Sequence, residues 1–539
     1  MSTQTTSTFD FSPTLIGRAM AGDAVTPREI GSKAAQLRAM ALLGLRVPPA
    51  FVLPTALCGP INAGEEGAIS AIRAGLKTGI RHLERETGRI FGDIRAPLLL
   101  SVRSGAERSM PGMMETVLNV GMNDGAVQGL MRLYGDPRLA WDSYRRFLQG
   151  YGEVVAGVPA AGYESRLAIM MEEEGVASDA GLDSEACERL AHAYVAFAQA
   201  SGHAVPVDTM EQLERTVLAV YRSWEAAKAR EYRRMNHFED LTGTAVTVQA
   251  MVFGNAGSDS GAGVAFSRDP ATGAQGVYAD FLFDAQGEDV VSGRRTPGDL
   301  ALLEQRLPQV ARELVEGILE LEKSRQDMQD VEFTVENGVL YFLQTRAAKR
   351  TPRAALKVAV DLVSEGIIDE VQGLALIGDI DPEQVVLTRF AADGMTPLAT
   401  GIAASPGTVA GRVAFDSEAA SAMARGADPV ILVRHDIATD DVAGIASAAG
   451  TLTAVGNRTA HAAVVARQLG RACVVGCGAL TIDGETGAVR LAGEPLAQGD
   501  WLSMDGGSGE VFKGRRAVLT ERPEAELATI GGWKSGRAA

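Results

Sequence analysis

Near the carboxyl end of the chain, residues 456–467 read Gly-Asn-Arg-Thr-Ala-His-Ala-Ala-Val-Val-Ala-Arg. The apolar residues just before this stretch predict a short strand, and its first two residues predict a turn. The Ala- and Val-rich run that follows predicts a helix that ends at Gly470, a residue suited to the left-handed helix cap. The spacing therefore places His461 at the start of a helix that follows a strand.

A histidine in this position can carry a phosphoryl group. Thr459 can cap the helix, and the unpaired N–H groups and positive dipole end of a helix start stabilise a phosphate held on a ring nitrogen. The same field disfavours the imidazolium ion, so the ring stays neutral and nucleophilic. The alternative is a histidine near a helix cap that has no chemical role.

Composition narrows the class of protein. A chain of 539 residues with 46% hydrophobic residues predicts a globular protein of two to four domains. The formal net charge of −17 argues against nucleic-acid binding, which needs a cationic face. We expect no membrane span and no targeting segment, and therefore a cytoplasmic location. Four scattered cysteines suit a reducing compartment, and for Cys473 and Cys477 buried thiols are favoured over a zinc site.

Hydrophobic periodicity predicts an α/β protein with a helical lobe at about 124–200. We expect single helices over 207–235 and over 299–325, with strands and Gly-rich turns between them. A compact Gly-rich β domain is predicted to run to Gly514, and the polar tail after it is predicted to be poorly ordered.

Residues 331–346 predict a β-hairpin that carries candidate metal ligands. We expect a three-residue loop at 336–338, which would place Asp330, Glu332 and Gln344 on one face with Arg346 beside them. Carboxylate and amide oxygens suit Mg²⁺ bound to a nucleotide, and the adjacent arginine can bind the same phosphates. The alternative is a solvated strand face with a surface ion pair.

Several long stretches then resemble the pyruvate phosphate dikinase family. Residues 101–119 read Ser-Val-Arg-Ser-Gly-Ala-Glu-Arg-Ser-Met-Pro-Gly-Met-Met-Glu-Thr-Val-Leu-Asn and closely resemble a loop of that family. Residues 31–37, 243–255 and 285–291 are similar to further family segments, as are Gln344-Thr345-Arg346 and the His461 stretch. Because the matches occur in family order over about residues 27–514, the chain is identified as a member of this family.

The resemblance implies an ATP-grasp nucleotide-binding domain followed by a swivelling phosphohistidine domain. The implied division is an ATP-grasp domain at 1–353, a helical linker at 354–396, a phosphohistidine domain at 397–514 and a tail at 515–539. In the family, ATP gives its β- and γ-phosphates to the histidine and AMP leaves. Inorganic phosphate then removes the outer group as pyrophosphate, and the remaining phosphoryl group passes to pyruvate.

The family motifs imply roles for particular residues of this chain. His461 would be the phosphoryl carrier, and Lys33, Arg103 and Arg346 would bind phosphates. Glu288 and Asp289 would lie at the nucleotide site. Asp330, Glu332 and Gln344 would hold Mg²⁺. Phosphoryl transfer of this kind depends on positioning and on neutralisation of charge.

The sequence departs from the family pattern at three places. Around the histidine, Asn457 and Arg458 replace a glycine and a methionine, and Ala460 replaces a serine. Arg458 can either alter the choice of acceptor or pair with one of the many acids of the chain. Ser32 replaces a glycine before the predicted phosphate-binding lysine. Only 25 residues follow Gly514, whereas the family's pyruvate site lies on a TIM barrel of about 250 residues.

These observations leave three functional hypotheses. The first is an ATP-dependent phosphotransferase that passes the group to pyruvate on a separate barrel protein. The second is a related kinase for a different small-molecule acceptor. The third is a non-catalytic nucleotide-sensing subunit, against which the retained Lys33, Arg103, Glu332, Arg346 and His461 argue.

Overall fold

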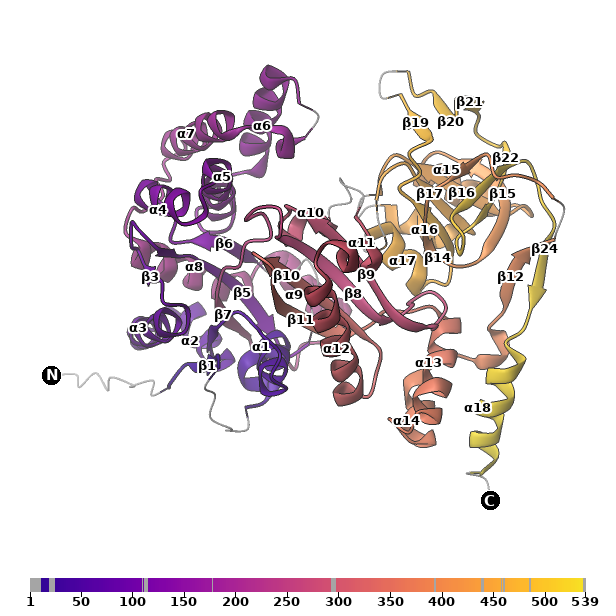
Figure 1. The fold of residues 1–539 in the computed structure, drawn as a ribbon, viewed down its shortest axis with the longest axis horizontal. Coiled ribbons are helices and arrows are strands. Elements are labelled where there is room, and N and C mark those ends of the chain that lie inside the picture. The colour runs from indigo at the N-terminus through magenta and orange to yellow at the C-terminus, as the bar shows by residue number, and fades with distance from the viewer. Residues whose placement is uncertain are drawn as a thin grey trace. The chain divides into compact units, whose positions relative to one another are not determined.

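The computed structural model describes residues 11–18, 25–108, 110, 115–176, 178–291, 297–391, 394–437, 441–456, 458, 461–483 and 486–536 (Figure 1). The side chains of residues 288, 291, 442, 461 and 468 are outside this description. Contacts divide the chain into two compact units. The first unit comprises residues 1–257 with 341–344, and the second comprises residues 258–340 with 345–539.

The first unit is built on an antiparallel sheet with the strand order β1-β2-β7-β5-β6. Its strands are β1 (Thr14–Ile16), β2 (Ala50–Leu53), β5 (Leu100–Ala106), β6 (Thr116–Val120) and β7 (Thr244–Ala250), beside the short pair β3 (Ile90–Phe91) and β4 (Pro97–Leu98). All seven residues of β7 are buried, as expected for a strand at the centre of a sheet.

The helices of the first unit pack around this sheet, and four of them form the predicted lobe. The helices are α1 (Pro27–Leu42), α2 (Cys58–Asn62), α3 (Glu66–Thr87), α4 (Asp124–Tyr134), α5 (Pro137–Val154), α6 (Ala160–Glu174), α7 (Ser184–Ala200), α8 (Thr209–Ser223) and α9 (Ala227–Met235), with short 3₁₀ turns at Thr55–Leu57 and Asp179–Gly181. Helices α4 to α7 make up the lobe near strand β6 (Figure 1).

The single helix expected over 207–235 is wrong, because the chain turns between α8 and α9. Arg233 of α9 folds back so that its guanidinium lies 3.9 Å from the Trp224 ring centroid, and its Nη1 donates to the Trp224 carbonyl oxygen at 2.7 Å. That carbonyl is the kind of unpaired acceptor found at a helix end. The side-chain contact therefore replaces a helical hydrogen bond, which hydrophobic periodicity does not reveal.

The second unit begins with a sheet of order β11-β10-β8-β9. Its strands are β8 (Gly261–Arg268), β9 (Gln275–Phe283), β10 (Gln329–Glu336) and β11 (Val339–Ala347). Between β9 and β10 lie α10 (Gly287–Val291), α11 (Leu300–Arg306) and α12 (Pro308–Arg325). The helix expected over 299–325 is thus broken at Leu307, whose φ of −132° is not helical. Leu307 precedes a proline, and a residue in that position is disfavoured from the helical region.

The hairpin loop differs from the expected one. It contains two residues, Asn337 and Gly338. Their φ values of 50° and 72° are both positive, as in a type I′ turn. Within β11 the buried positions are Leu340, Phe342 and Thr345, so the alternation slips by one residue. Despite the shorter loop, this slip leaves Thr345 bonded to Gln329 and Arg346 bonded to Asp330.

The second unit continues through a connecting segment into a larger sheet. The connection contains α13 (Pro352–Ser364), α14 (Glu370–Ile377), a 3₁₀ turn at Pro382–Gln384 and strand β12 (Leu387–Phe390). The larger sheet has the order β13-β23-β22-β15-β16-β17-β18-β14. Its strands are β13 (Ala399–Thr400), β14 (Ile402–Ser405), β15 (Thr408–Ala414), β16 (Val430–Arg434), β17 (Gly450–Thr453), β18 (Ala472–Val475), β22 (Trp501–Asp505) and β23 (Glu510–Lys513).

Helix α17 (His461–Gln468) links the parallel strands β17 and β18, as the sequence predicts. Gly470 after it has a φ of 61°, the predicted left-handed cap. The domain also contains α15 (Ser417–Met423) and α16 (Val442–Ser447), and a small sheet of β19 (Leu480–Ile482), β20 (Val489–Leu491) and β21 (Glu494–Leu496). Cys473 and Cys477 are buried free thiols, as expected. The predicted cap Thr459 lies outside the described residues.

Residues 515–536 contain a strand and a helix, whereas the sequence predicted a poorly ordered tail. Strand β24 (Val518–Glu521) pairs with β12, and α18 (Glu524–Gly536) follows it. Ile530 and Trp533 of α18 are buried in an apolar cluster with Leu356 of α13 and Ile377 of α14. The expectation rested on polarity alone, whereas two apolar residues three positions apart give this helix a buried face.

The structure confirms the α/β class predicted from the sequence. Along the described part of the chain, none of the helices combines the length and the apolar character that crossing a bilayer requires.

We predict that Ile530→Ala will loosen the carboxyl-terminal helix. The side chain is 1% exposed, and truncating a buried isoleucine costs about 2–5 kcal/mol. Hydrogen exchange of the amides in α18 and α13 should accelerate accordingly. The exposed neighbour Thr529 provides the control, because Thr529→Ala should leave exchange almost unchanged. Equal exchange in wild type and Ile530→Ala would show that α18 is not held by this cluster.

Candidate functional site

One face of the sheet β11-β10-β8-β9 carries three carboxylates. Val264 of β8 lies opposite Glu332 on one side and opposite Asp280 on the other. Residues directly opposite each other in an antiparallel pair project to the same face, so Glu332 and Asp280 share a face. Asp330 is two residues from Glu332 in the same strand and therefore projects there as well. We call this surface the acidic face.

Arg346 neutralises one end of the acidic face. Its Nε donates to Asp330 Oδ2 at 2.9 Å, and its Nη1 lies 3.8 Å from Glu332 Oε1. Asp330 is 7% exposed, and burial raises its pKa while Arg346 opposes the shift. The other oxygen, Asp330 Oδ1, is buried and has no hydrogen-bond partner among the described residues. An unpaired buried carboxylate oxygen is an available ligand atom.

Arg458, three residues before His461, lies at the other end of the acidic face. Arg458 Nη1 donates to Asp280 Oδ1 at 3.3 Å, and Arg458 Nε donates to the Ala403 carbonyl oxygen at 3.2 Å. Asp280 is 6% exposed, and burial raises its pKa while Arg458 opposes the shift. Of the two roles left open for Arg458, pairing with an acid of the chain is the one that the structure contains.

A second arginine, from α17 itself, ties this loop to the sheet. Arg467 Nη2 donates to the Arg458 carbonyl oxygen at 2.6 Å, and its guanidinium carbon lies 5.8 Å from the Phe266 ring centroid. Arg467 is 2% exposed, and burial lowers its pKa, an effect that the charges of Asp330 and other acids oppose. Since Phe266 lies opposite Asp330 in the sheet, the helix that begins at His461 packs over the acidic face.

Lys33 and Arg103 lie in the first unit, on α1 and β5. Gly31 interrupts α1 with a φ of 77°, and a Cβ atom placed there would lie 2.1 Å from the Gly105 carbonyl oxygen. A Cβ atom placed on Gly105 would lie 3.9 Å from Lys33 Cβ. Gly105 and Arg103 are two residues apart in β5, so Lys33 begins on the same side of the strand as Arg103.

Arg103 carries a buried donor with no partner among the described residues. Its Nε is buried without a hydrogen-bond partner among the described residues, and so is Oγ1 of Thr247, which lies opposite Arg103 in β7. Buried donors are normally paired, so an unpaired guanidinium N–H is a candidate ligand contact. The close approach of Gly31 to Gly105 therefore brings two predicted phosphate-binding cations to one side of β5.

The other predicted site residues are Asp289, Glu288, Gln344 and His461, and no described contact joins their side chains to the two groups above. Asp289 Oδ2 accepts a hydrogen bond from the Gln286 backbone N–H at 2.9 Å, so this carboxylate stabilises its own turn. Glu288 is in α10, but its side chain is outside the described set. Gln344 is in β11 and falls in the first unit, whereas Asp330 and Glu332 fall in the second. His461 opens α17, and its ring is also outside the description.

The sequence analysis missed Asp280 and Arg467. Both carried a signal, because each is a charged residue in an otherwise apolar stretch: Asp280 in Tyr-Ala-Asp-Phe-Leu-Phe at 278–283, and Arg467 in the Ala- and Val-rich helix. Such residues are almost never fully buried unless they are paired. The partner of each comes from a distant part of the chain, so the pairs themselves could not be read from spacing.

The acidic face offers ligands suited to a hard cation. Asp330 and Glu332 provide carboxylate oxygens, the ligands that Mg²⁺ uses together with nucleotide phosphates. The guanidinium of Arg346 lies beside both carboxylates. Across the described side chains, no cluster of three or more His, Cys, Asp or Glu residues forms a metal site made by the protein alone. A site that depends on substrate oxygens therefore fits these residues better than a structural metal site.

Comparison with known proteins gives two family matches. Residues 69–316 match the family described as "Pyruvate phosphate dikinase, AMP/ATP-binding domain", and residues 426–509 match "PEP-utilising enzyme, mobile domain". The second match contains α17 and the loop before it.

Individual relatives match along almost the whole chain. "Pyruvate, phosphate dikinase 2" of Zea mays is 42% identical over 508 residues, which are 94% of this chain and 57% of that protein. "Pyruvate, phosphate dikinase" of Clostridium symbiosum is 43% identical over 498 residues, or 92% of this chain and 57% of the relative. "Pyruvate, phosphate dikinase 1, chloroplastic" of Arabidopsis thaliana is 41% identical over 509 residues, 53% of its length. The chain thus spans a little over half the length of these relatives.

We predict that Arg346→Gln will destabilise the second unit in a pH-dependent way. Burial already raises the pKa of Asp330, so ionised Asp330 costs folding free energy at neutral pH. That cost vanishes as the pH falls below the unfolded value of about 3.9. Removing Arg346 raises this pKa further, so the free energy of unfolding should fall by about 1–3 kcal/mol at pH 7. Near pH 4 the difference from wild type should be small.

Urea unfolding at the two pH values measures this effect. Arg389→Gln is the matched control, since Arg389 forms an exposed pair with Glu521 that should contribute less than about 1 kcal/mol. An equal loss at both pH values for Arg346→Gln would mean that Asp330 does not depend on this arginine.

We also predict that Gly31→Ala will disrupt the approach of α1 to β5. The new Cβ atom would overlap the Gly105 carbonyl oxygen, and the left-handed φ adds backbone strain. Gly44 has a similar φ of 80° with no atom within 4 Å of the added Cβ, so Gly44→Ala measures the strain alone. The melting temperature should fall more for Gly31→Ala than for Gly44→Ala. Equal shifts would argue against the close approach.

Proposed function

This chain belongs to the pyruvate phosphate dikinase family, and from that premise we propose that it is a phosphotransferase that loads His461 from ATP. It combines a nucleotide-binding ATP-grasp domain and a mobile phosphohistidine domain. We assign residues 1–353 to the first, 354–396 to the linker, 397–514 to the second and 515–539 to the tail. The location is proposed to be cytoplasmic.

The proposed loading reaction uses a neutral ring nitrogen of His461 as the nucleophile. The nitrogen attacks the β-phosphorus of ATP, the bond from that phosphorus to the α-phosphate oxygen breaks, and AMP leaves. Inorganic phosphate then attacks the γ-phosphorus and departs as pyrophosphate, which leaves one phosphoryl group on the histidine. A covalent intermediate of this kind divides one difficult transfer into easier ones.

The contacts of the acidic face support this assignment most strongly. Arg458 and Arg467 hold the start of α17 over Asp280 and Asp330, so the helix that bears the carrier histidine packs on the sheet that carries the predicted nucleotide-binding residues. The cost of breaking partly buried ion pairs favours this docked position. A phosphoryl carrier needs such a position while it is being loaded.

The remaining roles follow from the family motifs. Lys33 and Arg103 would bind phosphates from the first unit, and Glu288 and Asp289 would lie at the nucleotide site. Asp330, Glu332 and Gln344 would hold Mg²⁺, which neutralises phosphate charge when bound, and Arg346 would orient the Asp330 carboxylate and contact the phosphates. The unpaired N–H of Arg103 and the unpaired oxygen of Asp330 fit these roles.

The acceptor is proposed to be pyruvate, bound by a TIM barrel supplied as a separate protein. This follows from the family and not from any residue of the described structure. A related kinase with another small-molecule acceptor is the second candidate, because Arg458 stands three residues before His461 where the family has methionine. The engagement of Arg458 by Asp280 favours pyruvate, since the added charge is already paired. A non-catalytic nucleotide-sensing subunit remains the third.

We predict that ATP labelled in its β-phosphate will label His461 in the presence of Mg²⁺. The label should be acid-labile and alkali-stable, as expected for a phosphohistidine, and AMP should form in equal amount. His461→Ala should abolish the label. His435→Ala, which changes an exposed histidine of the same domain, should retain it. Equal labelling of the wild type and His461→Ala would refute the assignment of the carrier.

A further inference from the structure

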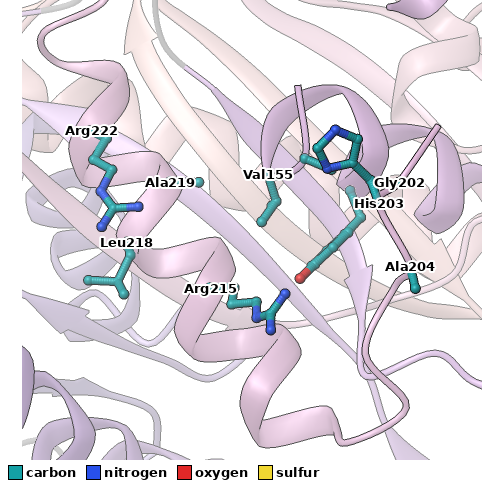
Figure 2. Close-up of a pocket in the computed structure, with 10 residues that line it drawn as sticks. Val155, Gly202, His203, Ala204, Arg215, Leu218, Ala219 and Arg222 are labelled. Atoms are coloured by element: carbon teal, nitrogen blue, oxygen red, sulfur yellow. The ribbon is translucent and has the colours of Figure 1, made fainter. Parts of the chain in front are cut away.

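A cavity of about 420 Å³ lies in the first unit, between the end of α5, the loop after α7 and helix α8. Figure 2 shows Arg215, Leu218, Ala219 and Arg222 along α8, with Val155 and His203 also at the cavity. The α8 positions follow the spacing i, i+3, i+4 and i+7, so they share one helix face. The volume is within the range of small-molecule sites.

The charged residues that line the cavity are cationic, although the chain as a whole is acidic. The lining includes Arg215, Arg222 and His203 but no carboxylate, although acids outnumber lysines and arginines in the chain by 68 to 51. Arg215 pairs with Glu211 in the preceding turn. The Arg222 side chain is exposed, and within the described part of the chain it makes no ion pair or hydrogen bond. A cationic cavity with one uncompensated guanidinium favours an anionic occupant.

Tyr151 adds a buried donor to the lining. Its side chain is 2% exposed, and its hydroxyl lies beside the Arg215 guanidinium. Burial raises the pKa of Tyr151 to about 12, and the nearby Arg215 opposes the shift. The hydroxyl therefore keeps its proton at neutral pH and can donate to an oxyanion.

Apolar residues line the space beside these polar groups. Val155, Leu218 and Ala219 offer no hydrogen bonds and favour hydrocarbon over water. A ligand that fits both parts needs an acidic group for the arginines and an apolar body for these side chains. An inorganic ion alone would leave the apolar part of the cavity unfilled.

We infer that this cavity is a binding site for a small organic oxyanion, a phosphate monoester or a carboxylate with an apolar body. We call it the α8 site. It is lined by residues of the helical lobe and α8, and it shares none of its lining residues with the acidic face or with Lys33 and Arg103. The inference therefore does not rest on the proposed phosphotransfer.

Calorimetric titration of the full chain tests this inference with three probes of one shape. Phenyl phosphate and benzoate carry an acid on an apolar ring, and benzyl alcohol is the neutral analogue. We expect saturable binding of one or both acids and at least about tenfold weaker binding of the alcohol. A preference between the acids would identify the acidic group.

Variants locate the binding. Arg222→Gln and Arg215→Gln should each weaken the acid probe by about tenfold or more, because each removes a charged hydrogen-bond donor. Arg189→Gln is the matched control, since Arg189 is similarly exposed and also paired with a glutamate, but lies outside the cavity. Arg103→Ala should leave this binding intact, which separates the α8 site from the predicted nucleotide site. Unchanged melting temperatures would verify the fold of each variant.

Absence of saturable binding for both acids would overturn the inference, and so would either of two further results. One is binding of benzyl alcohol as tight as that of both acids, which would make the cavity merely apolar. The other is acid binding that survives in the Arg215→Gln, Arg222→Gln double variant or is lost in Arg103→Ala, which would place it elsewhere. Failure of His461 to become labelled by ATP would affect neither result.

Discussion

The acidic face depends on a single physical constraint: buried carboxylates need cationic partners. Asp280 and Asp330 are both more than nine-tenths buried, and burial raises the pKa of each. Arg346 comes from the same hairpin as Asp330, whereas Arg458 reaches Asp280 from 178 residues away in the chain. Removing one partner of such a pair leaves an uncompensated charge, so the pairs fix where the histidine-bearing loop lies in this unit.

The same constraint connects structure to the proposed chemistry. Arg467 donates hydrogen bonds to the carbonyl oxygens of Arg458 and Ala404, and its positive charge interacts with the acids of the sheet. Arg458, three residues before His461, thus bonds both to Ala403 of the larger sheet and to Asp280 of the acidic face. Asp330 retains one unpaired oxygen in this arrangement. The face therefore brings the helix that begins at His461, the proposed carrier, near an unpaired carboxylate oxygen, as the proposed loading step would require.

Local signals in the sequence predicted much of the fold. The α/β class, the helical lobe, the strand before α17 and the cap at Gly470 follow from periodicity and glycine positions, which act over a few residues. Tertiary contacts decided the rest. The break at Trp224 depends on Arg233 folding back, and the order of α18 depends on a surface supplied by α13 and α14. No local pattern contains that information.

The candidate site also combines features that the sequence predicted with features that depend on tertiary contacts. The hairpin pattern brought Asp330, Glu332 and Arg346 together although the expected loop length was wrong, because a slip within β11 compensates for the shorter turn. Asp280 was missed because its partner, Arg458, lies 178 residues away in the chain. For Lys33 and Arg103 the decisive feature is the approach of Gly31 to Gly105, which needs two glycines that are distant in sequence.

The most direct test of the account is a double-mutant cycle between Asp280 and Arg458, read as the rate at which ATP labels His461. If this ion pair positions Arg458 for loading, Asp280→Asn and Arg458→Gln should each slow loading, and the double variant should be hardly slower than either one. That pattern would correspond to a coupling energy of about 0.5–3 kcal/mol. If the two effects simply add, or if neither change slows labelling, the contact does not seat the carrier loop and the account is contradicted.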